Sequence, residues 1–83
     1  MFDPCFHQWL QVRWENEQSH RYYEARVLKN LLAEWEVFCL WGGIGTRFGG
    51  STVIPVTSLD EAQATLAKIA VRRTKRHYLQ VRP

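Results

Sequence analysis

The sequence predicts an α+β fold, in which a small antiparallel sheet of four or five strands carries one helix across one face. Apolar and polar residues alternate along much of the first half of the chain, as in half-buried strands. All five glycines fall within 42–50, and one helical pattern occupies 58–73. A chain of 83 residues is the size of one small domain, so we expect 1–83 to form a single domain.

Three stretches in the first half, 6–14, 21–28 and 35–41, read as successive strands of an antiparallel meander. In the second stretch the apolar side chains that share one face are Tyr23, Ala25 and Val27, opposite Glu24 and Arg26. The polar stretch 15–20 is expected to be a loop. Residues 29–34 could form either a helical turn or the end of a hairpin.

The second half predicts a short strand at 51–54, stopped by Pro55, and then the helix. Ser58 and Glu61 have the spacing of a capping box, which marks the start of the helix. A stripe at helical spacing faces the sheet, and its members are Leu59, Ala62, Leu66, Ile69, Ala70 and Arg73. A final strand is expected at 78–81.

The four tryptophans are too many to be incidental in a chain of this length. A small sheet can use such large side chains to fill its core. We expect Trp35 and at least one of Trp9 and Trp14 to be buried. Trp41 ends a strand beside flexible glycines and is the tryptophan expected to be exposed.

The net charge of +3 is unevenly distributed. Residues 1–67 carry five basic and eight acidic side chains (5 − 8 = −3), whereas 68–83 carry six basic ones and no acid (+6). This asymmetry indicates an anionic partner, nucleic acid or a membrane surface, although a solvated basic tail would look the same. No apolar run approaches the length of a membrane span, and the first residues lack a signal-peptide pattern. We therefore expect a cytoplasmic protein that does not enter a membrane.

The residue types used in metal sites and catalysis do not form a recognisable constellation. Cys5 and Cys39 are far apart and are expected to be free thiols, and no close pair of metal ligands occurs. No serine lies in a sequence motif of the kind that marks a catalytic nucleophile activated by a histidine and an acidic residue. The glycine-rich loop lacks the pattern of a phosphate-binding loop, although its backbone N–H groups could still bind an anion. We expect no metal, no cofactor and no enzymatic activity.

The glycine-rich loop also carries a family resemblance. Trp41-Gly42-Gly43-Ile44-Gly45-Thr46, with Gly49-Gly50, resembles the Trp-Gly-Arg-Ile/Val-Gly signature of the WGR domain, which occurs in DNA-dependent poly(ADP-ribose) polymerases and in small bacterial proteins. Four other segments resemble the family in the same order, namely Arg21-Tyr22-Tyr23, the strand 35–40 that leads into the motif, Leu59-Asp60-Glu61-Ala62 and Lys75-Arg76-His77-Tyr78. The resemblance spans residues 6–81 and implies an antiparallel sheet with one helix and a role in binding DNA.

The resemblance also implies roles for individual residues. Trp41 would stack against a terminal nucleotide, Arg21 would be the basic residue near a 5′ phosphate, and His20 stands where the polymerases often have asparagine. The motif arginine is replaced by Gly43, which weakens the inference of DNA-end recognition. Arg47 could supply the missing charge from the same loop.

Together, these observations predict a non-catalytic nucleic-acid-binding module for double-stranded DNA or DNA ends, with low sequence specificity. Phosphates would be neutralised by the basic residues near the end of the chain, Arg72, Arg73, Lys75 and Arg76. The alternative is a protein-interaction module that joins a larger complex through a sheet edge or the outer face of the helix. The sequence does not indicate an oligomeric state.

Overall fold

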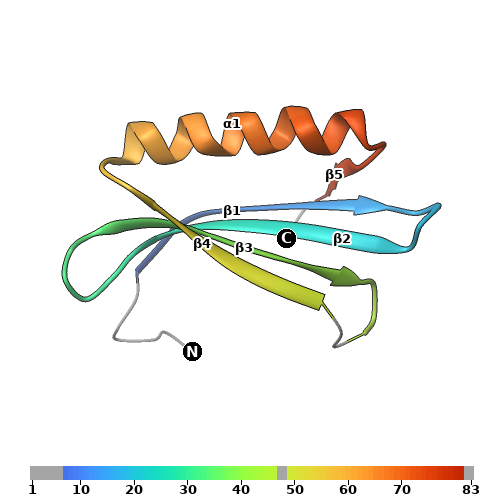
Figure 1. Cartoon of the computed structure of the whole chain (residues 1–83), viewed down its shortest axis with the longest axis horizontal. Helices are drawn as coiled ribbons and strands as arrows, with labels where there is room; N and C mark the ends of the chain where they lie inside the picture. Colours follow the sequence, from blue (N-terminus) through green and yellow to red (C-terminus); the bar gives the residue numbers. More distant parts are fainter. Residues whose placement is uncertain (1–6, 47–48, 82–83) are drawn as a thin grey trace.

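The structure is a computed structural model that describes residues 7–46 and 49–81, with the backbone alone for 7–9. Five strands and one helix follow one another along the chain (Figure 1). Their bounds are β1 (His7–Asn16), β2 (Arg21–Lys29), β3 (Trp35–Gly43), β4 (Gly49–Val56), α1 (Leu59–Lys75) and β5 (Leu79–Val81).

The strands form one antiparallel sheet in the order β4-β3-β2-β1-β5, and α1 lies across one of its faces (Figure 1). This arrangement confirms the predicted α+β fold. The first four strands are sequential neighbours, as in a meander. The short β5 returns after the helix to pair with β1 at the opposite edge of the sheet from β4.

The turn between β1 and β2 is shorter than the predicted loop at 15–20. Glu15 and Asn16 belong to β1, where they pair with Tyr22 and Arg21 of β2. The Asn16 side chain accepts a hydrogen bond from the Ser19 backbone N–H (3.1 Å) and donates one to the Arg76 carbonyl (3.0 Å). These polar residues therefore belong to the strand although they do not alternate with apolar ones, because strand pairing and the hydrogen bonds of Asn16 hold them in place.

Residues 29–34 form the end of a hairpin and not a helical turn. The Asn30 side-chain oxygen accepts hydrogen bonds from the backbone N–H groups of Leu32 (2.9 Å) and Glu34 (3.0 Å). The backbone N–H of Asn30 also donates to the Glu34 carbonyl at 2.9 Å. One asparagine thus fixes the loop and leaves Leu31 and Leu32 exposed by 75% and 77%.

The prediction that Pro55 would stop the fourth strand was wrong, because β4 runs on to Val56. Pro55 pairs with Glu36 of β3, and β4 forms an edge of the sheet. A proline is tolerated on an edge strand, where the missing N–H need not break a ladder.

The helix begins after the predicted N-cap. The Ser58 hydroxyl accepts a hydrogen bond from the Glu61 backbone N–H at 3.1 Å, as the capping box requires. The Glu61 carboxylate, however, accepts from the backbone N–H and hydroxyl of Thr57 instead of returning to Ser58. At its other end the helix continues to Lys75, two residues beyond the prediction.

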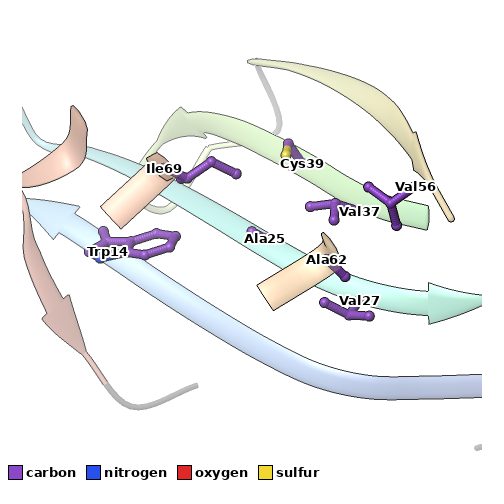
Figure 2. Packing of buried hydrophobic residues seen from close by; sticks show 8 residues of the cluster. All are labelled: Trp14, Ala25, Val27, Val37, Cys39, Val56, Ala62 and Ile69. Atoms are coloured by element: carbon purple, nitrogen blue, oxygen red, sulfur yellow. The ribbon is translucent and has the colours of Figure 1, made fainter. Parts of the chain in front are cut away.

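The core lies between α1 and the covered face of the sheet (Figure 2). Its buried members are Trp14, Ala25, Val27, Val37, Cys39, Val56, Ala62 and Ile69. Leu59 and Leu66 pack against this cluster while partly buried, and so does Trp35, which was expected to belong to the core. Cys39 is a buried free thiol, as expected, whereas Cys5 and the Trp9 side chain lie outside the described residues.

The opposite face of the sheet carries an ion-pair network. Arg13 pairs with Glu15 at 2.9 Å and with Glu24 at 3.4 Å, and Arg26 pairs with the other oxygen of Glu24 at 2.6 Å. Glu24 is buried, and its charge is compensated by these two arginines. Across 7–46 and 49–81, the structure contains no helix with the length and apolar character of a membrane span.

Candidate nucleic-acid interface

A groove of about 430 Å³ lies between the C-terminal half of α1 and strands β2, β3 and β4. Its basic residues are Arg21, Arg72, Arg73 and Arg76. The aromatic ones are Tyr22, Tyr23, Trp41 and Tyr78. No described acidic side chain lines this basic groove, so its charge is entirely positive.

Two elements supply the exposed cations of the basic groove. Arg21 is the first residue of β2 and pairs in register with Gly43 of β3. Arg72 is in the last turn of α1 and Arg76 is its C-cap residue, and both line the groove at this end of the helix. The ion pairs of the described residues involve only Arg13 and Arg26 among the arginines, so the groove arginines have no described carboxylate partner.

Arg73 differs from the exposed Arg72 because its side chain packs against aromatic rings. Its guanidinium lies 4.4 Å from the centre of the Tyr23 ring and 5.0 Å from the centre of the Tyr78 ring. Both contacts are cation–π interactions, and the buried Nε atom has no described hydrogen-bond partner. Arg73 thus packs on the inner face of the helix, where the predicted stripe placed it, and forms the wall of the groove.

Trp41 is held between neighbouring strands. Its indole is stacked on the Tyr23 ring, with centroids 5.9 Å apart and planes inclined by 11°. On the other side, a Cβ atom at Gly50 would come within 2.8–2.9 Å of three indole atoms. The side chain remains 36% exposed, which confirms the predicted exposure of this tryptophan. A ligand would therefore meet the exposed margin of the indole and not the face stacked on Tyr23.

Comparison with family models gives a match to the WGR domain over residues 6–83. The chain belongs to the WGR domain family. This is a family of nucleic-acid-binding modules, and a WGR domain is a module and not a catalytic domain. Comparisons with curated proteins and with solved structures gave no match.

The WGR signature of this chain has glycine at the arginine position, and the backbone conformation there does not require glycine. Among the described glycines, only Gly45 has a positive φ, of 77°. A Cβ atom at Gly43 would come within 3.0 Å of the Thr46 hydroxyl oxygen and 3.4 Å of its methyl carbon, so the Thr46 side chain would have to shift slightly. The absence of arginine is therefore not imposed by the backbone at Gly43.

Two other predicted site residues, His20 and Lys75, lie outside the basic groove. His20 is exposed at the turn before β2 with a φ of 58°, and its carbonyl accepts a hydrogen bond from the Ile44 N–H at 2.9 Å. Lys75 is exposed on the last turn of α1 but does not line the groove. Arg47 lies outside the described residues.

Tyr23, which lines the basic groove, and the neighbouring Cys39 are held in their neutral forms. Burial, together with a hydrogen bond to Cys39, raises the pKa of Tyr23 to about 12. Burial also raises the pKa of the Cys39 thiol, against the opposing effects of Tyr23 and Arg73. A buried neutral thiol is a poor nucleophile. Within 7–46 and 49–81, no three histidine, cysteine or acidic side chains are grouped to hold a metal ion.

Six residues of the groove were not predicted as site residues, namely Tyr22, Tyr23, Gly42, Thr52, Ile54 and Tyr78. Thr52 and Ile54 reach it because β4 pairs with β3 beside Trp41, and no motif marks them in the sequence. Tyr78 is placed by the turn after the helix, where its N–H donates to the Arg73 carbonyl at 2.9 Å. The signal that could have found Tyr78 is an aromatic residue directly after the basic end of an amphipathic helix.

Proposed function

We propose that this WGR chain is a non-catalytic module that binds double-stranded DNA, including its ends, through phosphate contacts. One observation carries the proposal. Arg21, Arg72 and Arg76 come from two elements, converge on one groove beside the half-exposed Trp41, and have no described carboxylate partner. Exposed guanidinium groups without partners are suited to bidentate, charge-assisted bonds with phosphate oxygens.

The proposed mechanism is electrostatic and independent of base sequence. Arginines that neutralise phosphates release condensed counterions, and this release supplies most of the affinity at low salt. Trp41 would contact the nucleotide beside the bound phosphate with the exposed margin of its indole. Contacts of this kind fix the position of a duplex without reading its bases.

The chemistry of the groove supports a binding role over a catalytic one. No described carboxylate lines it, the Tyr23 phenol is held neutral, and the Cys39 thiol is buried. General acid–base catalysis needs a group that exchanges protons near the working pH, and neither of these groups does so.

The second candidate function is protein interaction within a larger complex. Leu31 and Leu32 favour it, because a fixed loop presents them to solvent side by side at 75% and 77% exposure. Adjacent exposed apolar side chains are typical of interaction surfaces. The loss of the motif arginine at Gly43 also favours this candidate over DNA-end recognition.

We also propose that residues 1–83 form a single WGR-like domain located in the cytoplasm. The helix and the strands share one core, which supports a single domain. The buried free thiol of Cys39 is compatible with a reducing compartment.

A titration of labelled duplex DNA in a mobility-shift assay tests the proposed function. Blunt, nicked and 5′-phosphorylated duplexes should all bind at low salt, and the affinity should fall steeply as salt is raised. Failure to bind any duplex at low salt, or an affinity that does not change with salt, would contradict DNA binding. A protein partner retained at high salt would instead support the second candidate.

A further inference from the structure

The outer edge of β4 is the longest unpaired strand edge among the described residues. The eight residues of β4 pair with β3 on one side in continuous register, from Gly49 opposite Gly42 to Val56 opposite Trp35. On the other side no described strand pairs with them. The opposite edge of the sheet consists of β5, which has three residues, and of residues 7–12 of β1, which β5 does not pair. An unpaired edge presents a row of backbone N–H and C=O groups that can pair with another strand.

This edge lacks most of the features that keep proteins from pairing edge to edge. Natural edge strands are protected by charged side chains, bulges or a short length. No residue of β4 is charged, its pairing with β3 has no register shift, and the Val53 side chain is 45% exposed. Pro55 removes one donor near the end of the strand and leaves Gly49–Ile54 able to pair.

The charges at the two ends of α1 indicate which partner strand could pair with this edge. Because α1 follows β4 directly and runs back across the sheet, its acidic first turn lies near the end of β4 (Figure 1). Asp60 and Glu61 are in that turn, and the last turn carries Arg72, Arg73 and Lys75. If a second copy pairs antiparallel with β4, the acidic turn of each helix lies toward the basic turn of the other. A two-fold axis makes the charge pattern self-complementary.

From these observations we propose that two copies of this chain form a dimer through antiparallel pairing of their β4 strands. The two sheets become one continuous sheet, and both helices lie on the same face of it. Backbone hydrogen bonds and the apolar side chains of β4 supply the contact, and the opposite charges at the helix ends set its direction. The two basic grooves then open on the same face of the dimer.

The mass of the nucleic-acid-free chain in solution tests this proposal. Sedimentation velocity with a reducing agent present, from about 1 µM to 1 mM, covers the range of weak to moderate self-association. The expected result is a concentration-dependent species with twice the mass of one chain. Val53→Lys adds a charge in the middle of the edge and should shift the midpoint at least tenfold upward. Leu32→Lys, which alters an exposed apolar residue of the β2–β3 loop, should leave the midpoint unchanged.

A charge exchange tests the orientation of the two copies. Asp60→Lys should weaken the dimer, and the double variant Asp60→Lys/Lys75→Glu should restore part of its stability, because positions 60 and 75 again carry opposite charges. Circular dichroism melting of each variant verifies that it is folded. A chain that stays monomeric up to the highest concentration overturns the proposal, as does a dimer that is unaffected by Val53→Lys. A dimer weakened equally by Leu32→Lys would place the contact elsewhere and also overturn it.

Discussion

The indole of Trp41 is stacked almost parallel on the ring of Tyr23, with the two centroids 5.9 Å apart. The two residues are direct partners in the β2–β3 register, and Gly50 is the partner of Trp41 on β4. The indole is therefore positioned by strand pairing and not by the adjacent glycine-rich loop. A binding side chain held in this way loses little conformational freedom when a ligand arrives.

Replacing Gly50 with alanine should displace the indole, because the added methyl group would lie within 2.8–2.9 Å of three of its atoms. We expect Gly50→Ala to lower the free energy of unfolding by about 1–3 kcal/mol, as overpacking does, and to change the tryptophan fluorescence. Ser51→Ala, at the exposed next position, is the matched control and should alter neither property. An unchanged Gly50→Ala protein would show that Trp41 is not packed against β4.

The contribution of the groove arginines can be separated from that of net charge. Arg72→Ala/Arg76→Ala removes two cations from the groove and should make the salt dependence of duplex binding shallower by about 1.8 in logarithmic slope. Lys68→Ala/Lys75→Ala removes the same charge from helix positions that do not line the groove, and should change the slope less. Equal slopes for the two double variants would count against localised binding in the groove.

Restoring the signature arginine should strengthen end binding. Gly43 does not have a positive φ, and its new side chain would start on the same face of the sheet as Trp41. We expect Gly43→Arg to raise the affinity for a 5′-phosphorylated duplex about tenfold, as one charge-assisted contact can. Gly43→Gln, which lacks the charge, should give no such gain. If a stable Gly43→Arg protein binds ends no better, the DNA-end interpretation fails and the interaction candidate is favoured.

The stability of the chain should fall in strong alkali because of Tyr23. Its pKa is raised from 10.0 to about 12, mainly by burial, so the unfolded chain loses this proton before the native one does. The stabilisation is complete below pH 10 and is lost as the pH rises through about 12, by up to about 2–3 kcal/mol. Unfolding in urea across this range measures the loss, which should be smaller in Tyr23→Phe and preserved in Tyr22→Phe.

The helix should contribute to the core mainly through one large side chain. Ile69 is buried, so Ile69→Ala should lower the free energy of unfolding by about 2–5 kcal/mol. Leu66 packs against the core while partly buried, and Leu66→Ala should cost less. Chemical denaturation of the two variants gives the comparison, and a larger loss for Leu66→Ala would contradict the described packing.

Strand and helix types could be predicted because their signals are local. Alternation in β2, the cap at Ser58 and the stripe ending at Arg73 each need only a few neighbouring residues. Strand ends were less predictable, since they depend on partners from distant segments. Asn16 stays in β1 by pairing with Arg21, and Pro55 stays in β4 because that strand is at the edge.

The candidate site was predictable only in part. The motif resemblance singled out Trp41 and Arg21, and the charge pattern singled out Arg72 and Arg76, which the structure brings to the same groove. The sequence did not indicate that Arg73 packs against aromatic rings. This packing is made with Tyr23 and Tyr78, which are far apart from each other in the sequence. Tyr23 is far from Arg73 in the sequence and leaves no local signal beside it, whereas Tyr78 directly follows the basic end of the helix.

The position of Trp14 bears on how the chain folds during synthesis. This tryptophan belongs to the first strand, yet it is buried in the core that the helix completes. The helix and β5 leave the ribosome after the four longer strands, so the nascent sheet keeps an uncovered apolar face until residues 59–75 have emerged. Folding is consequently expected to finish late and abruptly, and a ribosome-bound chain cut before the helix is expected to be a target for chaperones.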